Sequence, residues 1–125
     1  MLSDYYEALE LPKNADQNQI NEAFRKLSLK WHPDNKNNSN KKLTYNKFCE
    51  VCEAFQVLSD PEKKGILDAH GIFKLKNGFM QNGMLVGGYE FQGNPEDIFE
   101  QFFGTNKFYA AIVQFENEFA NYLND

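Results

Sequence analysis

The stretch Ala23-Phe24-Arg25-Lys26-Leu27-Ser28-Leu29-Lys30-Trp31-His32-Pro33-Asp34 decides how the first half of this chain folds. Apolar residues recur here at the i, i+3, i+4 and i+7 spacing that is typical of one helix face: Ile20, Ala23, Phe24, Leu27 and Trp31. Asp16 stands where an N-cap is expected, and Pro33 disfavours helical geometry at the residue before it. The pattern predicts a helix from Asp16 to about Trp31. Its opposite face is mostly basic and is expected to expose Arg25, Lys26, Leu29 and Lys30.

The residues that follow predict an antiparallel helix pair. Residues 34–40 are too polar to bury and are expected to form a mobile loop. A second stripe at helical spacing comes next, in Phe48, Val51, Cys52, Phe55 and Leu58. Because the loop is too short for a parallel return, the two stripes should face each other, with His32 and Asp34 at the tip of the hairpin.

Shorter helices are expected on either side of this pair. Asp4 precedes a short apolar stripe that Pro12 ends. Asp60 and Pro61 supply the cap and first turn of a helix that runs to His70 and ends at Gly71. The predicted fold class is therefore all-α, with a four-helix domain over residues 1–71.

This arrangement resembles the J-domain of the DnaJ (heat shock protein 40) co-chaperones over residues 3–71. The resemblance is carried by Asp4-Tyr5-Tyr6-Glu7-Ala8-Leu9, by the opening stretch with its His-Pro-Asp tripeptide, and by residues 48–60 followed by Pro61-Glu62-Lys63-Lys64. It implies that the chain binds a DnaK-type (heat shock protein 70) chaperone and stimulates ATP hydrolysis by that partner. It implies no catalytic residue, cofactor or metal in this chain, and the lack of cysteine repeats is like class B members without a client-binding domain.

The resemblance also implies a partner-binding site, formed by His32, Pro33, Asp34, Arg25, Lys26, Leu29 and Lys30. Pro33 fixes the loop, so the carboxylate of Asp34 can be held toward an arginine of the partner in a charge-assisted pair. The basic side chains would steer association with an acidic patch, and Leu29 would add apolar contact.

Four positions depart from the family pattern. Asn21 and Glu22 stand where basic residues are usual, and Phe24 and Leu67 stand where tyrosines are usual. The basic face is thereby diluted, and binding is expected to be weaker or selective for one partner.

Composition argues against several other classes of function. The formal net charge of −5 and the isoelectric point near 5.0 make nucleic acid an unexpected partner. The longest apolar run is the six residues from Phe108 to Val113, against the roughly 18 to 20 of a membrane-spanning helix. Cys49 and Cys52 make at most half a zinc site. A small enzyme that uses His32 and Asp34 stays open as a rival, although no nucleophile accompanies them.

The second half divides into a linker and a tail. Residues 72–93 contain five glycines and are expected to be a flexible linker without regular elements, similar to a Gly/Phe-rich segment of the DnaJ family. Met80, Met84, Leu85 and Val86 are unusual for such a segment. Residues 94–125 are expected to form an acidic, aromatic-rich helical tail, in which Asn94 and Pro95 begin the first helix.

The tail carries an apolar stripe that needs a partner surface. Its members are Ile98, Phe99, Phe102, Phe103, Phe108, Ile112, Phe115 and Phe119. They are expected to dock either on this chain's own J-domain or on a larger assembly. Residues 87–104 resemble the ciliary and sperm-flagellar, radial-spoke-associated member of the DnaJ family. An alternative function is therefore a structural subunit of a ciliary axoneme, with the J-domain as an architectural module.

The expected location follows from the start of the chain. Asp4, Glu7 and Glu10 interrupt the first ten residues, so neither the basic start nor the apolar run of a secretory signal is expected. We expect a cytoplasmic protein, or one of the ciliary axoneme if the resemblance of the tail holds.

Overall fold

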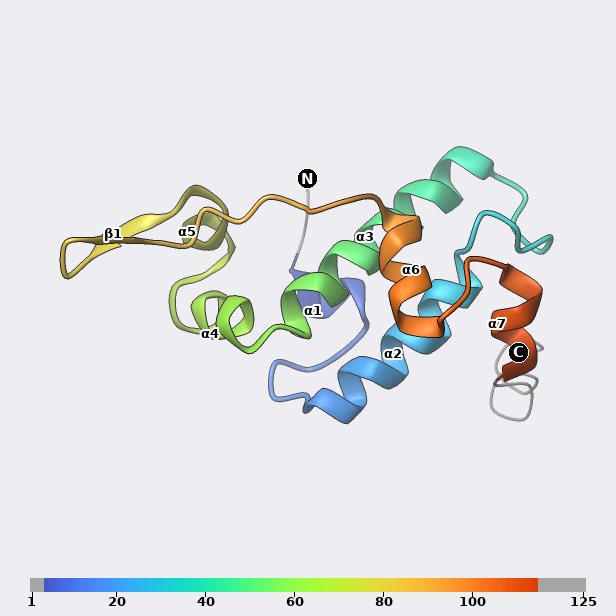
Figure 1. Ribbon diagram of the computed structural model, residues 1–125, viewed down its shortest axis with the longest axis horizontal. Coiled ribbons are helices and arrows are strands. Elements are labelled where there is room, and N and C mark those ends of the chain that lie inside the picture. Colours follow the sequence, from blue (N-terminus) through green and yellow to red (C-terminus); the bar gives the residue numbers. More distant parts are fainter. Residues whose placement is uncertain (1–3, 115–125) are drawn as a thin grey trace.

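A computed structural model describes residues 4–114 of the 125-residue chain and shows a mostly helical fold. In chain order the elements are α1 (Tyr5–Ala8), α2 (Gln17–Lys30), α3 (Lys41–Leu58), α4 (Pro61–His70), α5 (Ile72–Asn77), β1 (Phe79–Gln81), β2 (Met84–Val86), α6 (Pro95–Phe103) and α7 (Phe108–Gln114). Figure 1 shows α2 and α3 as the long central pair, with the hairpin of β1 and β2 projecting at one end. Within residues 4–114, no helix is long and apolar enough to cross a membrane.

The first four helices begin at side-chain caps, which the sequence predicts at Asp16 and Asp60. Asp16 accepts a hydrogen bond from the backbone N–H of Gln19, whose side chain in turn accepts one from the N–H of Asp16. Asn40 and Asp60 cap α3 and α4 as acceptors only, from the N–H of Leu43 and of Glu62. These bonds satisfy donors that have no partner inside the helix, so local sequence fixes where each helix starts.

The core lies between α2 and α3, with α1 packed against α3. Phe24 is fully buried, and its ring stacks on Phe55 with centroids 4.2 Å apart. The ring of Phe102, from α6, meets Phe24 edge-on at 5.0 Å. A tyrosine hydroxyl here would need a polar partner in an apolar environment. The departure from the family pattern at Phe24 therefore suits the additional ring supplied by α6.

The segment after α4 contains regular structure, so the expectation of a linker without it is wrong. The glycines lie between elements rather than within them: Gly71 and Gly78 flank α5, and Gly83 completes the turn between β1 and β2. Asn82 and Gly83 both have positive φ, 53° and 79°, which fits a two-residue hairpin turn. Glycine density here marks turn positions and not disorder.

The tail returns to the four-helix domain. Helix α6 begins at an Asn94–Asp97 capping box, ends at Gly104 in the left-handed conformation, and packs against α3, whereas α7 packs against α2 (Figure 1). Four of the predicted anchor residues are buried: Ile98, Phe99, Phe103 and Phe108. Two others are half-buried: Phe102 and Ile112. Phe115 and Phe119 lie outside the described residues. In this conformation the chain's own four-helix domain receives the stripe.

Candidate partner-binding site

The loop after α2 is fixed to the end of that helix by side-chain amides. The Nδ2 atom of Asn35 donates to the carbonyl oxygens of Leu29 and Lys30, both at 3.1 Å, and Asn38 donates to the same Lys30 oxygen at 2.9 Å. These carbonyls would otherwise have no partner at the helix end. The expectation that residues 34–40 are too polar to bury is therefore wrong at Asn35, which is buried because its amide caps α2.

Pro33 and Asp34 lie exposed at the tip of the hairpin. The side chain of Asp34 is 71% exposed, and its backbone N–H donates to Nδ1 of His32 at 3.0 Å. This bond and the caps on α2 set the direction of the loop without using the Asp34 carboxylate. The carboxylate is thus presented to solvent on a fixed backbone, as an ion-pairing site for a partner requires.

His32 is buried, unlike its two neighbours. Its ring lies 4.6 Å from Phe99, 5.1 Å from Phe108 and 5.3 Å from Phe48, measured between centroids. The imidazole is therefore enclosed by rings from α3, α6 and α7. Burial lowers the pKa of His32, an effect that the charges of Asp34 and Glu96 partly oppose.

The basic face of α2 is only partly open. Leu29 is fully buried, so the expectation of an exposed Leu29 is wrong. Leu29 belongs to the core cluster that also contains Phe108, and α7 packs against α2. Arg25 donates to Glu22 at 2.7 Å, and its guanidinium lies 5.7 Å from the centre of the Phe102 ring. The tail helices thus contact the surface on which the sequence places the partner.

Lys26 and Lys30 complete the predicted basic set on α2. Lys26 is half-buried, whereas Lys30 is exposed and lies over the ring of Trp31 at 5.4 Å. The structure therefore brings all seven predicted residues to one end of α2 and the adjoining loop. Among them it leaves Pro33, Asp34 and Lys30 as the exposed members.

The two cysteines lie on α3. Both are free thiols, and Cys52 is fully buried. Burial raises the pKa of the Cys52 thiol, so it stays protonated and packs as a small apolar group. Across the part of the chain that the structure describes, no group of three or more His, Cys, Asp or Glu residues is placed to hold a metal ion.

Comparison with known proteins identifies the family. The model of the DnaJ domain matches residues 4–68, which span α1 to α3 and most of α4. The chain belongs to the DnaJ domain family. It is 44% identical over 104 residues to DnaJ homolog subfamily B member 6 of Bos taurus, covering 81% of this chain and 43% of that protein. It is 48% identical over 103 residues to the chaperone protein DnaJ of Clostridium kluyveri, covering 81% of this chain and 26% of that protein.

A solved structure shares the J-domain fold. The crystal structure of the J-Trx1 fragment of ERdj5 matches with a TM-score of 0.52 and 28% identity, over 79% of this chain and 47% of that fragment. The chain spans less than half the length of each of these three proteins. The match with the bovine protein, at 104 residues, is longer than the J-domain itself, so the similarity continues into the segment that returns to it.

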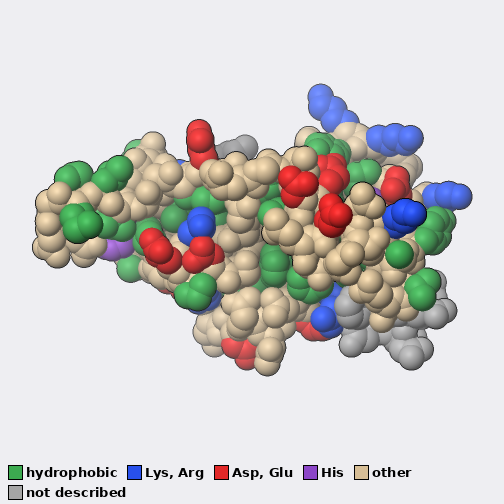
Figure 2. Space-filling view, in the orientation of Figure 1, with side chains coloured by type: hydrophobic (Ala, Val, Ile, Leu, Met, Phe, Trp, Pro, Cys, Tyr) green, Lys and Arg blue, Asp and Glu red, His purple; other side chains and the backbone are tan. Residues whose placement is uncertain are grey.

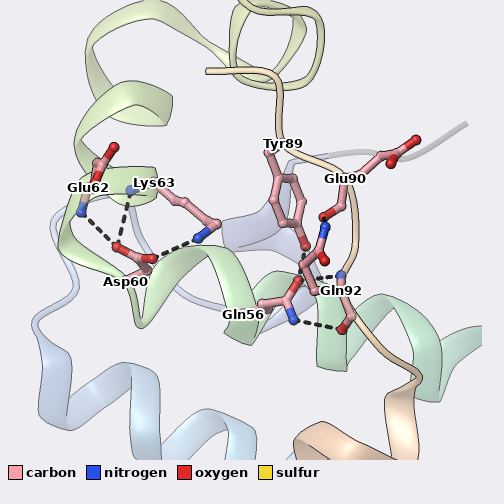
Figure 3. Close-up of polar contacts among 7 residues, drawn as sticks. All are labelled: Gln56, Asp60, Glu62, Lys63, Tyr89, Glu90 and Gln92. Carbon is pink, nitrogen blue, oxygen red and sulfur yellow. Dashed lines mark hydrogen bonds and ion pairs between the residues drawn. The ribbon is translucent and has the colours of Figure 1, made fainter. Parts of the chain in front are cut away.

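A polar latch fastens this returning segment to the J-domain, and sequence patterns gave no sign of it. Figure 3 shows the side chain of Gln56, on α3, bonded to Tyr89 and Gln92. Its Oε1 atom accepts from the Tyr89 hydroxyl at 2.6 Å and from the Gln92 N–H at 3.1 Å, while its Nε2 atom donates to the Gln92 carbonyl at 3.0 Å. The amide therefore pairs with backbone as a neighbouring strand would. We call Gln56, Tyr89 and Gln92 the latch.

We expect Gln56→Ala to loosen α6. The substitution removes all three bonds and leaves the hydroxyl of the largely buried Tyr89 unpaired, a loss of about 1–3 kcal/mol. Backbone amides of α6 should then exchange with deuterium faster, by roughly 5- to 100-fold, while those of α2 keep their rates. Gln56→Glu is the matched control, because it keeps both acceptor bonds and should fall between wild type and Gln56→Ala. Equal exchange in all three proteins would show that the latch does not hold α6.

We also expect acid to release the tail helices. In the docked state the Asp34 N–H donates to Nδ1 of His32, so adding a proton to Nδ1 would bring two donors together. Burial also holds the His32 pKa below its ordinary value of 6.5. The undocked state therefore binds the proton more tightly. Docking should therefore become less favourable as the pH falls, by up to about 1.4 kcal/mol per pH unit below the ordinary pKa of the histidine.

Exchange of amides in α6 and α7, corrected for intrinsic rates, measures this effect between pH 5 and 8. Docking should be constant above about pH 7.5 and weaken below about pH 6.5. His32→Phe cannot titrate and should remove the dependence. A pH dependence that survives in this variant would assign the effect to another group.

Proposed function

We propose that this member of the DnaJ family binds a DnaK-type (heat shock protein 70) chaperone and stimulates its ATP hydrolysis through the loop of His32, Pro33 and Asp34. The observation that carries the proposal is the exposed carboxylate of Asp34 on a loop fixed by the caps at the end of α2. Lys30 beside it adds positive charge for steering an acidic partner. A charge-assisted pair with a partner arginine would use a group that the fold itself does not need.

The proposal assigns the chain no catalytic chemistry. A catalytic histidine needs access to substrate and a nucleophile or a second titrating group within reach. The imidazole of His32 is instead walled by Phe48, Phe99 and Phe108, and its Nδ1 atom already accepts a backbone bond. This environment suits a residue that shapes a loop better than one that transfers protons.

The packing of α6 and α7 supports a proposal in which these helices restrain the stimulation of ATP hydrolysis. Phe99 and Phe108 cover His32, Phe102 lies against Arg25, and α7 packs on α2. A chaperone that engages this face has to displace α6 and α7 first. Stimulation is then governed by the small fraction of molecules in which the tail helices are undocked.

The test is steady-state ATP turnover by a purified DnaK-type chaperone with substoichiometric amounts of the full chain. We expect turnover to rise with added chain and to saturate below equimolar amounts, because one co-chaperone serves many cycles. Unchanged turnover at all ratios, with both wild type and a tail-released variant, would overturn the proposal. A ciliary location is tested separately, by whether tagged chain is retained in isolated axonemes.

The prediction that the chain belongs to a radial-spoke assembly rests on the resemblance of residues 87–104 to the radial-spoke-associated member of the family. The aromatic side chains that would anchor the chain there, Phe99 and Phe103 among them, are buried against its own J-domain. Docking on an assembly would therefore compete with self-docking. The double variant Phe99→Asp, Phe103→Asp should lose axonemal retention if this part of the tail is the anchor.

A further inference from the structure

Tyr45, in the second turn of α3, is one of two tyrosines that lie open to solvent among residues 4–114. It is 40% exposed, and Tyr109 on α7 is 63% exposed, whereas Tyr5, Tyr6 and Tyr89 are buried. An enzyme that modifies hydroxyl groups can therefore reach these two side chains. Of the pair, Tyr45 lies where two helices meet, so a modification there has a structural consequence.

The ring of Tyr45 lies at the contact between α3 and α6. Its centroid is 6.4 Å from that of Phe48, which lies 6.2 Å from that of Phe99 on α6. Partial burial, with the nearby Cys49 and Glu96, raises the pKa of Tyr45 to about 12. Glu96 belongs to the first turn of α6. The hydroxyl is therefore uncharged at neutral pH, and an uncharged group tolerates the carboxylate of Glu96 beside it.

The two helices carry opposite charge near this contact. Helix α6 contains Glu96, Asp97 and Glu100 and no basic residue, whereas residues 35–49 contain four lysines and no acidic residue. Figure 2 shows Lys side chains over the start of α3 beside acidic side chains over α6. Such complementarity favours docking, and a negative group added on the α3 side would oppose it.

Two lysines lie one helical turn before Tyr45. Lys41 and Lys42 precede it by four and three residues, so all three lie on one side of α3, and a helical side chain leans toward the turn before it. Both lysines are exposed, and neither has an ion-pair partner in the part of the chain that the structure describes. A phosphate on Tyr45 would thus be attracted by Lys41 and Lys42 and repelled by Glu96.

We propose that Tyr45 is a phosphorylation site for a protein tyrosine kinase, and that its phosphate pairs with Lys41 and Lys42 and releases α6 from α3. In the reaction the Tyr45 oxygen attacks the γ-phosphorus of ATP. The new oxygen–phosphorus bond replaces the bond to ADP, which leaves, and the hydroxyl proton passes to a base of the kinase. The product carries a charge of about −1.5 to −2 at pH 7, so repulsion from Glu96 replaces an uncharged contact.

This inference goes beyond the stimulation of ATP hydrolysis, because it concerns how α6 docks. Docking is measured by hydrogen exchange without any chaperone, so failure of the proposed function leaves the inference intact. If both hold, phosphorylation should also lower the concentration of chain that gives half-maximal stimulation.

Access to Tyr45 is tested by treating the folded full chain with ATP and a tyrosine kinase domain of broad specificity. We expect mass spectrometry to locate phosphate on Tyr45, and Tyr45→Phe to lose that phosphate. A kinase domain that modifies a synthetic peptide of residues 38–50 but not Tyr45 of the folded chain would overturn the proposal. Failure to modify the peptide would overturn it as well, because the segment would then be no kinase substrate.

The structural effect is tested on full chain that carries phosphotyrosine at position 45, introduced by codon suppression. Backbone amides of α6 should exchange with deuterium about 5- to 30-fold faster than in the unmodified chain, while those of α2 keep their rates. Phosphotyrosine at position 109 is the matched control. It adds the same charge at a more exposed tyrosine with no lysine three or four residues before it, and should leave the exchange of α6 unchanged.

Two variants assign the effect to the named charges. Glu96→Gln removes the repulsion and should reduce the release that phosphorylation causes. Lys41→Gln, Lys42→Gln should raise the second pKa of the phosphate, followed by phosphorus-31 NMR, because a phosphate held by two lysines titrates below its ordinary value of about 6. A phosphate pKa that the double lysine variant leaves unchanged would remove Lys41 and Lys42 from the switch.

Three results of the exchange experiment overturn the proposal. One is equal exchange of α6 amides in the chain phosphorylated at Tyr45 and in the unmodified chain. Another is an equal increase with phosphate at position 109, which would make added charge the cause wherever it lies. The third is slower exchange of α6 in the chain phosphorylated at Tyr45, which would mean that the phosphate holds the helix.

Discussion

Asp34→Asn should abolish stimulation of ATP turnover while leaving the fold of the chain unchanged. The substitution keeps size and hydrogen-bonding shape but removes the charge from a side chain that is 71% exposed. Truncating one partner of a charge pair buried at an interface costs about 2–5 kcal/mol, which corresponds to a 30- to several-thousand-fold loss of affinity. The backbone bond from the Asp34 N–H to His32 is retained, so the loop should keep its direction.

Steady-state turnover of the chaperone with substoichiometric chain measures this loss, and far-ultraviolet circular dichroism checks the helix content. Glu7→Gln is the matched control, an exposed acid on α1 whose neutralisation should leave turnover unchanged. Full stimulation by folded Asp34→Asn protein would remove Asp34 from the site. Both variants keep the tail helices, so each is compared with a wild type that carries the same restraint.

His32 gives a less direct test than its neighbour. Sequence alone places His32 on a hairpin tip. On that basis His32→Gln is expected to abolish stimulation of ATP turnover, as Asp34→Asn is. The structure encloses the ring among Phe48, Phe99 and Phe108, so His32→Gln also changes how α6 and α7 dock. Loss of a partner contact and release of the tail would then oppose each other. Combining His32→Gln with a tail-released variant separates the two effects.

The parts of the fold that local sequence determines could be predicted. Asp16 and Asp60 mark helix starts because a cap acts within three residues, and the stripe that contains Phe24 reports which helix face is buried. Gly71 ends α4 as expected. The turn of Asn82 and Gly83 is a short-range hairpin signal, but the many glycines around it favoured the interpretation as a linker.

The burial of Leu29 and His32 could not be predicted in the same way. On the period of α2 alone, Leu29 lies opposite the apolar stripe and should be exposed. It is buried in a core cluster that also contains Phe108 of α7, a helix that packs against α2 from the far end of the chain. Nothing within one helical turn of Leu29 encodes this packing of α7 on α2. The same holds for Gln56, whose partner Gln92 lies 36 residues away. Contacts of this kind appear only when the position of the returning segment is known.

Phe99→Ala should release the tail helices and raise stimulation at low concentrations of chain. Phe99 is 1% exposed and contacts the rings of His32, Phe48 and Phe103. Removing a buried phenylalanine side chain costs about 3–5 kcal/mol. Ile98, Phe102 and Phe103 still hold α6, but a loss of this size is large for the docking of a nine-residue helix, so most molecules should hold α6 undocked. The four-helix domain keeps its own core and should stay folded.

Two measurements on the full chain follow this release. Amides of α6 and α7 should lose protection from exchange, while those of α2 and α3 keep most of theirs. The concentration of chain that gives half-maximal stimulation should fall by a factor of roughly 10 or more. Tyr109→Ala, which removes an aromatic ring that is 63% exposed on α7, should match wild type in both. Faster exchange without any gain in stimulation would mean that the tail covers this face but does not restrain it. Since Phe99 contacts His32 directly, a gain in stimulation that disappears again in Phe99→Ala, Asp34→Asn would connect the covered ring and the exposed carboxylate as parts of one site.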